Sequence, residues 1–244
     1  MTVADRFDAG GRLDLSDPIW RRLYGCYGEL DVAAELRRLT AAWDEDRAGA
    51  LFYDELHHQE TLFPATWAAF PWIWRIAERD EDARASCLGF LSHVVYCAAE
   101  DDGTLAPGSL NGLALDPAAH ARAYRPPDRR PGPGDGPVLE RIAGSALALV
   151  PALDAACIAS VEDDPMTAAF LLSGPLAIRG VPQASSALEW EGTGEGWQAI
   201  VGQMGWTPGR RQKEALTGLA RSVQARAPTV ARVLREVAGG SALN

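Results

Sequence analysis

Two groups of residues in this sequence have types and spacings that could bind a metal ion or transfer a proton. The stretch LHHQETLFPATW (56–67) contains adjacent histidines, His57 and His58, followed by Glu60. Farther along, His93 and Cys97 stand at i and i+4, where an imidazole and a thiolate on one helix face could share a metal or form a nucleophilic pair. One hypothesis is therefore a metal-assisted hydrolase or lyase that uses His57, His58 or His93 with nearby carboxylates.

Helix geometry argues against a metal site at the adjacent histidines. His57 and His58 would point about 100° apart on a regular helix, whereas a helical zinc site needs two histidines at i and i+4, as in HExxH. Asp54 precedes His58 by four residues, so on a continuous helix this pair would favour a protonated imidazole. This stretch is therefore better suited to placing charged side chains at a surface that a partner can contact than to binding a metal.

The same stretch is also typical of a short connection between two helices. We expect one helix to end near Gln59, where imidazolium and amide groups can cover its last carbonyls. Thr61 would cap the next helix, and Pro64 is tolerated in its first turn because no intrahelical N–H is needed there. For His93 and Cys97, a buried thiol beside a half-buried histidine is the simpler explanation. We predict no catalytic residues, no bound metal and no cofactor.

The elements that position these residues are predicted to be helices nearly throughout. Apolar residues recur at intervals of three and four around Val32 to Trp43, Trp67 to Ala77 and Cys87 to Ala98, and no run alternates apolar and polar residues. Further helices are expected from Pro137 to about Val161 and from Pro165 to Ile178. The pattern predicts an all-α fold without strands, with the Trp67 helix in its core.

Acidic triplets stand where these helices begin or end, at 44–46, 80–82, 100–102 and 162–164. Carboxylates accept hydrogen bonds from unpaired N–H groups at helix starts and lie favourably against the positive end of the helix dipole. Stacked helix pairs would also line up their turns along one edge as an acidic ridge. The residues that we expect to bind a partner are Asp44, Glu45, Asp54, His58, Glu60, Asp80, Glu81 and Asp82.

The segments LYGCYGELDVAAELRRL (23–39) and LFYDELHHQETLFPATWAAFPWIWRIAE (51–78) together resemble the opening of a family of bacterial HEAT-like helical-repeat proteins. The resemblance implies an α-solenoid of short antiparallel helix pairs and implies no particular reaction, because repeat scaffolds serve many functions. Glu60 stands where the family pattern has glycine, which argues against a left-handed backbone at this corner. The CPxCG-like element of the family is also missing, so a zinc role does not carry over.

We expect helical repeats at 1–103 and 137–244, in the same superhelix, separated by a Pro-, Gly- and Arg-rich loop or linker at 104–136. The first residues lack the apolar stretch of a secretory signal, and the longest apolar runs are short or broken by charges. The four cysteines form no CxxC pair and are expected to be reduced. A cytoplasmic protein without a membrane span, from a bacterium with high-GC codon usage, is therefore expected.

The net charge of −10 is concentrated in the first half, because residues 1–120 contain 21 acidic and 10 basic side chains. Nucleic acid is a poor partner for such a surface, since that affinity comes largely from Lys and Arg. The leading hypothesis is a non-enzymatic helical repeat protein that binds a protein, in particular a basic one, through its acidic N-terminal half. An immunity protein that holds a toxin inactive, or a regulatory protein, would be an example.

Overall fold

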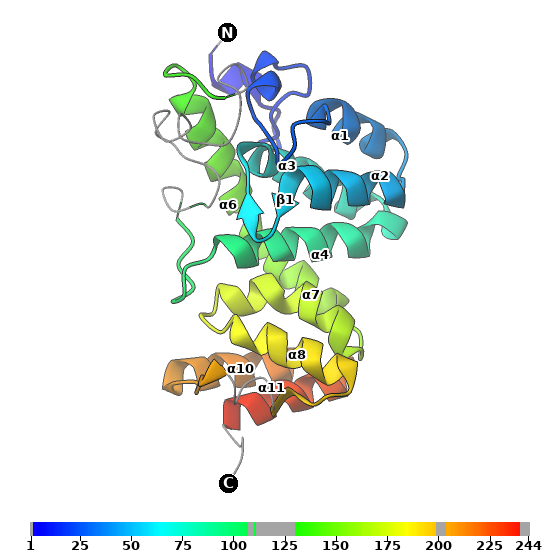
Figure 1. Ribbon diagram of the computed structural model, residues 1–244, viewed down its shortest axis with the longest axis vertical. Helices are drawn as coiled ribbons and strands as arrows, with labels where there is room; N and C mark the ends of the chain where they lie inside the picture. Colours follow the sequence, from blue (N-terminus) through cyan, green and yellow to red (C-terminus); the bar gives the residue numbers. More distant parts are fainter. Residues whose placement is uncertain (1, 107–109, 111–129, 199–203, 240–244) are drawn as a thin grey trace. The chain divides into compact units, whose positions relative to one another are not determined.

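The computed structural model describes residues 2–106, 110, 130–198 and 204–239, and it has an all-α fold (Figure 1). Within these residues the departures from helix and loop are one hairpin of two-residue strands and an isolated bridge between Phe7 and Leu13. The expected all-α class is confirmed, and the small hairpin corrects the expectation that no strand would form.

The chain divides into two compact units, and two of the three divisions fall inside the long helices α4 and α6. Unit 1 comprises residues 1–87 and 105–150, and unit 2 comprises residues 88–104 and 151–244. The expected boundary at 104–136 falls largely on residues 107–109 and 111–129, which lie outside the described part of the chain. That boundary therefore stays a prediction.

Unit 1 is built from helices and the two short strands of one hairpin. They are η1 (Ala4–Arg6), η2 (Pro18–Arg21), α1 (Val32–Ala41), α2 (Glu45–Gly49), η3 (Ala50–Leu56), β1 (His57–His58), β2 (Thr61–Leu62), α3 (Pro64–Arg79), and the first parts of α4 (Glu81–Ala98) and α6 (Gly136–Ser160). Helix α3 carries the core of this unit, because Trp67, Phe70 and Ile73 are fully buried. The expectation that the Trp67 helix lies in the core is confirmed.

Carboxylates cap the starts of α1 and α2 in unit 1, and the one at α2 belongs to the first acidic triplet. Asp31 Oδ1 accepts the Ala34 N–H at the start of α1 at 3.0 Å, and Asp44 Oδ1 accepts the Arg47 N–H at the start of α2 at 3.0 Å. Each bond satisfies one of the N–H groups that the first turn of a helix leaves without an internal partner. Local sequence thus fixes where these helices begin.

Unit 2 contains the remaining parts of α4 and α6, followed by α7 (Pro165–Ala177), α8 (Gln183–Thr193), α10 (Arg210–Val223) and α11 (Pro228–Gly239). Asp164 caps α7 by accepting the Thr167 N–H at 3.0 Å, and hydrogen bonds from Thr167 lower the pKa of the Asp164 carboxyl. Helix α7 ends at Ala177, and Gly180 follows with a φ of 69°. The predicted start at Pro165 is confirmed.

A proline inside α7 is accommodated by a serine from α4, and both lie in unit 2. Pro175 has no N–H, so the carbonyl of Leu171 lacks its usual partner within the helix. The hydroxyl of Ser92, a fully buried side chain, donates to that carbonyl at 2.9 Å and accepts the Gly174 N–H, also at 2.9 Å. One hydroxyl therefore satisfies two backbone groups that the kink releases.

One more backbone carbonyl near Pro175, that of Phe170, finds its partner within α7 itself. The Ser173 hydroxyl donates to the Phe170 carbonyl at 2.8 Å, which replaces the bond that a regular helix would take from Gly174. A side chain at Gly174 would bring its Cβ to 2.7 Å from the Ser92 carbonyl oxygen, so the close approach of α4 and α7 requires glycine.

Helix α6 passes through Pro151 and Asp154 without interruption, which confirms the helix expected from Pro137 to about Val161. By length and composition it could cross a membrane, and 28% of its most apolar window is buried. This is weak evidence, because a core helix of a water-soluble protein passes the same test. Asp154 in this helix forms a two-bond ion pair with Arg179, at 2.6 and 2.9 Å.

We expect Ser92→Ala to lower the free energy of unfolding by about 1–3 kcal/mol, because it leaves the Leu171 carbonyl and the Gly174 N–H buried without their partner. Urea unfolding followed by circular dichroism measures the change. The control is Ser222→Ala, which removes an exposed hydroxyl on α10 and should change stability by less than about 0.5 kcal/mol. Equal stability of the two variants would contradict the assignment.

Candidate functional site

The histidine stretch forms a tight hairpin rather than a helix end. Helix η3 is a π-helix that stops at Leu56; His57 then pairs with Leu62 and His58 with Thr61 in an antiparallel ladder. The expected helix end near Gln59 and the expected cap at Thr61 are therefore wrong. A two-residue turn of this kind needs positive φ angles at both central positions, because only then does its twist match that of the strands.

Gln59 and Glu60 supply these angles, with φ values of 47° and 62°. The expectation that glutamate would avoid a left-handed backbone at this corner is therefore wrong. The tertiary structure imposes the conformation on Glu60, which is exposed and needs no room for its side chain inside the fold.

Thr66 connects the hairpin to the next helix. Its hydroxyl donates to the Leu56 carbonyl, and the same oxygen accepts the Phe63 N–H at 3.0 Å. Thr66 and Leu56 are both buried, so the bond to the Leu56 carbonyl is shielded from water. Helix α3 begins at Pro64, which agrees with the expectation that proline stands in its first turn, although Phe63 rather than Thr61 precedes it.

The two adjacent histidines do not converge on one point. The His57 Nε2 atom accepts the Glu60 N–H at 3.1 Å within the hairpin, while the His58 Nδ1 atom lies 3.5 Å from the Tyr27 hydroxyl. Consecutive strand residues point to opposite faces, which separates the two imidazoles more than a helix would. The one-turn spacing expected for Asp54 and His58 also fails, because the helix ends before His58. Asp54 itself is exposed on η3.

A buried carboxylate that the sequence pattern did not single out lies beside this stretch. Glu55 is only 2% exposed, and its side chain accepts the N–H groups of Gly28 and Glu29 at 2.9 and 3.3 Å. Its backbone carbonyl accepts the Cys26 N–H at 2.7 Å. The residue thus anchors segment 26–29 to η3. In sequence, Glu55 follows exposed Asp54, so no local signal distinguishes the buried from the solvated carboxylate.

Glu55 also lines the larger of two cavities described in unit 1, with a volume of about 780 Å³. Trp20 and Tyr24 contribute aromatic walls, and Glu29, Asp31 and the exposed Arg37 contribute charges of both signs. Sequence reasoning missed this cavity, because it forms where the loops and short helices of residues 15–37 fold back on themselves and against Glu55. The mixed charges favour no single class of ligand.

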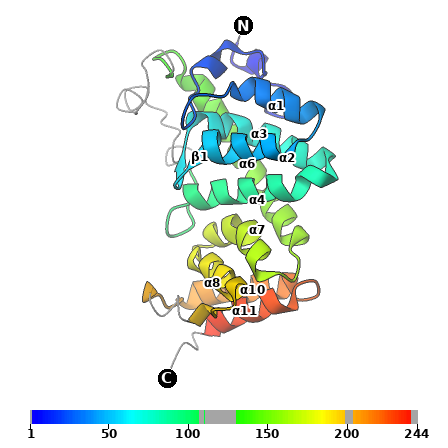
Figure 2. The same ribbon diagram turned by 45° about the vertical axis from the view of Figure 1, so that its right-hand side comes forward.

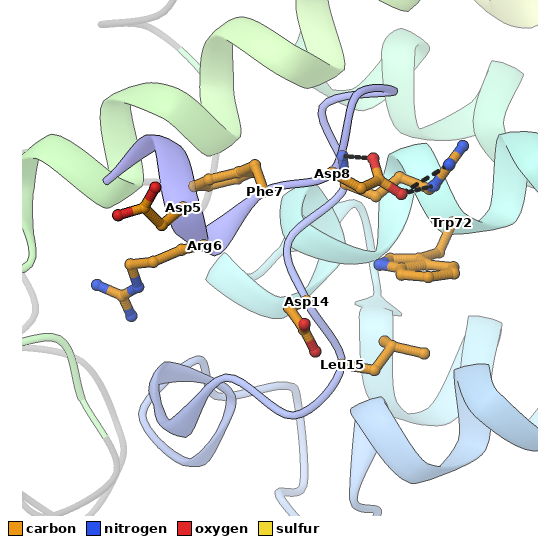
Figure 3. Close-up of a pocket in the computed structure, with 8 residues that line it drawn as sticks. Asp5, Arg6, Phe7, Asp8, Asp14, Leu15 and Trp72 are labelled. Atoms are coloured by element: carbon orange, nitrogen blue, oxygen red, sulfur yellow. Dashed lines mark hydrogen bonds and ion pairs between the residues drawn. The ribbon is translucent and has the colours of Figure 1, made fainter. Parts of the chain in front are cut away.

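The smaller cavity, of about 260 Å³, lies between the N-terminal segment and α3 (Figure 3). Figure 3 shows Asp8 and Trp72 toward one end of it and Asp5 toward the other. The Asp8 carboxylate accepts the Arg12 Nε–H at 2.8 Å, and the Arg12 guanidinium lies 5.4 Å from the centre of the Trp72 ring. The N-terminal segment therefore covers Trp72, which agrees with a packing role for this tryptophan.

The first two acidic triplets lie close together in unit 1. In Figures 1 and 2 the α1–α2 turn and the α3–α4 turn lie beside each other on the right-hand side. The Glu45 Oε1 atom accepts the Ser86 hydroxyl at 2.6 Å, which joins the start of α2 to the first turns of α4. We call this surface the acidic edge; it consists of Asp44, Glu45, Asp46, Asp80, Glu81 and Asp82.

Some carboxylates of the acidic edge cap helices, and others are exposed to solvent without such a bond to the backbone. Asp44 caps α2, and Asp80 accepts the N–H groups of Asp82 and Ala83 at 3.0 and 3.1 Å at the start of α4. Glu81 and Asp82 are exposed to solvent in the first turn of α4. The edge therefore combines carboxylates that build the helices with carboxylates that face outward. Glu60 and His58 belong to the hairpin and are not part of it.

Aromatic side chains border the acidic edge. The Trp43 Nε1–H donates to the Glu45 carboxylate at 3.1 Å, and the Trp43 ring lies 6.4 Å from that of Phe52. Tyr53 is 49% exposed, and partial burial together with the charge of Glu45 raises the pKa of its hydroxyl. A carboxylate surface next to half-exposed rings suits the guanidinium group, which pairs with carboxylates and stacks on aromatic faces.

His93 and Cys97 lie one turn apart on the part of α4 that belongs to unit 2. The His93 Nε2 and Cys97 Sγ atoms are 3.4 Å apart, and both side chains are half-buried. Burial lowers the pKa of the His93 imidazole, which favours its neutral form. The expected half-buried histidine is thus observed, while the thiol beside it is also half-buried rather than fully enclosed.

No family model, no curated protein and no solved structure matches this chain. The resemblance to HEAT-like repeat proteins therefore stays a prediction.

We expect Glu60→Gly to raise the free energy of unfolding by about 0.5–1 kcal/mol, because glycine adopts a positive φ without the steric cost that a Cβ atom adds. Thermal unfolding of the variant and the parent protein measures the difference. The control is Glu81→Gly on α4, where glycine should instead lower stability by about 1 kcal/mol. If Glu60→Gly instead lowered the free energy of unfolding, the contacts of the Glu60 side chain would stabilise the protein by more than the steric cost of its positive φ.

Proposed function

We propose that this protein is a non-enzymatic α-helical scaffold, built as a HEAT-like solenoid of helix pairs, which binds a basic protein through the acidic edge of unit 1. The observation that carries the proposal is the joining of two acidic turns by the bond between Glu45 and Ser86. A site made from two adjacent turns presents a wider charged surface than either turn alone, and its charge complements a basic partner.

The arginines near the acidic edge support its negative character. The Arg47 guanidinium donates to the buried Glu35 carboxylate at 2.6 Å, and the Arg84 guanidinium donates to the Ala77 carbonyl at 3.3 Å. These contacts lie within unit 1, and the Arg47 Nε atom also lies 3.9 Å from the Asp44 carboxylate, so Arg47 offsets part of the charge of Asp44 but not that of Glu81 or Asp82. The outward carboxylates keep their charge available to a partner.

The aromatic border supports arginine as the main contact of the partner. Interface anchors are enriched in Trp, Tyr and Arg, and they pair with one another across an interface. Trp43 and Tyr53 stand beside Glu45, so an arginine could pair with a carboxylate and stack on a ring at once. A lysine could form only the ionic part of this contact. An immunity or regulatory protein that holds a basic toxin or enzyme would use such a surface.

The test replaces acidic-edge carboxylates by amides of equal shape: Asp44→Asn, Glu45→Gln, Asp80→Asn, Glu81→Gln and Asp82→Asn. Asparagine caps helices as well as aspartate does, so the fold should be retained. We expect the affinity for a labelled oligoarginine peptide, measured by fluorescence anisotropy, to fall at least about tenfold. The dependence of that affinity on salt concentration should also weaken.

The matched control neutralises five exposed carboxylates of unit 2, namely Glu100, Glu162, Glu189, Glu195 and Glu214. It removes the same charge from the chain and should change the affinity by less than about twofold. If the two variants lose affinity equally, the peptide responds only to net charge, and the acidic edge has no special role. An oligolysine peptide should bind the parent protein more weakly than oligoarginine does.

A further inference from the structure

His93 and Cys97 form a pair whose position is fixed by a regular helix. They are separated by one turn of α4, and their Nε2 and Sγ atoms are 3.4 Å apart. The His93 ring lies nearly parallel to the Tyr96 ring, with centroids 5.8 Å apart and 16° between the planes. Helix and ring contact together limit the freedom of the imidazole, so the two ligand atoms meet without a change of backbone.

The separation of these atoms matches one edge of a tetrahedral metal site. Zinc binds histidine nitrogen at about 2.0–2.1 Å and cysteine sulfur at about 2.3 Å, so at a tetrahedral angle the two ligand atoms stand about 3.6 Å apart. The observed 3.4 Å differs from this by a few tenths of an ångström, which side-chain rotation can supply. A metal ion would therefore replace the contact between thiol and imidazole without rebuilding the helix.

The burial of the pair also leaves room for an ion to enter. His93 and Cys97 are both half-buried rather than enclosed in the core. Nitrogen and sulfur together select zinc and chemically related ions over magnesium or calcium, which prefer oxygen.

We propose that His93 Nε2 and Cys97 Sγ chelate one divalent ion of the zinc class. On binding, the thiol releases its proton to solvent while one bond forms to sulfur and one to nitrogen; nothing is oxidised or reduced. Two further positions of the tetrahedral shell would be filled by water. This site is independent of the acidic edge, because its residues belong to unit 2 and bind a metal rather than a protein.

The other described cysteines are poorer metal ligands, with one exception that serves as a control. Cys87 and Cys157 are completely buried, and burial raises the pKa of the Cys87 thiol well above its usual range. The Cys157 Sγ atom lies 3.8 Å from the Leu88 carbonyl oxygen, with which it is hydrogen-bonded. Cys26 is half-buried like Cys97, so it tests whether any accessible thiol would bind.

The experiment titrates the full chain, purified without an affinity tag, with Co²⁺, which gives an absorption band when a thiolate binds it. We expect the band to saturate at one equivalent and to disappear when Zn²⁺ is added. Cys97→Ser should abolish it, His93→Ala should weaken Co²⁺ binding at least about tenfold, and Cys26→Ser should leave it unchanged.

A second measurement needs no variant and covers the case in which a substitution disturbs folding. Zn²⁺ should protect Cys97, but not Cys26, from alkylation by iodoacetamide, as read by peptide mass spectrometry. The proposal is overturned if the parent protein gives no cobalt band, if the band survives Cys97→Ser, or if zinc protects both thiols equally. Circular dichroism of each variant confirms that it retains its helices.

Discussion

Backbone groups at the ends of short helices must find partners outside the helix, and in unit 1 the hydroxyl of Thr66 meets this need at the turn before α3. It bonds both the Leu56 carbonyl, where η3 ends, and the Phe63 N–H, just before α3 begins. Leu56 is buried, and a buried backbone group without a partner costs about 1–3 kcal/mol, so the bond to its carbonyl stabilises the end of η3. The hairpin that contains both histidines lies between the two backbone groups that Thr66 joins.

The same constraint explains much of the acidity of this protein. Asp31, Asp44 and Asp80 each accept backbone N–H groups at a helix start, and Asp164 does so in unit 2. A fold made of many short helices has many such starts, and carboxylates cap them well. Part of the negative charge is thus a consequence of the architecture. The outward carboxylates at the α3–α4 turn, Glu81 and Asp82, exceed what capping requires, and they are the ones available to a partner.

The two histidine groups show why spacing within an element matters more than adjacency in sequence. His57 and His58 are neighbours, yet the strand directs them to opposite sides and the hairpin occupies His57 with the Glu60 N–H. His93 and Cys97 are four residues apart, and a regular helix brings their ligand atoms together. A nitrogen and a sulfur that could share an ion therefore come from one turn of α4 rather than from the adjacent histidines.

The sequence by itself determined the all-α class, the capping carboxylates and the start of α7 at proline, because each depends on residues within one or two helical turns of each other. It also placed Trp67 in the core, since the helix around it is apolar on most sides. Only the tertiary structure decided the π-helical form of η3, the left-handed backbone of Glu60 and the burial of Glu55. It likewise decided that Ser92 completes the kink at Pro175. These features depend on contacts such as those of Glu55 with Gly28 and of Ser92 with Leu171, whose partners lie 27 and 79 residues apart in the chain, and no local pattern records such pairs.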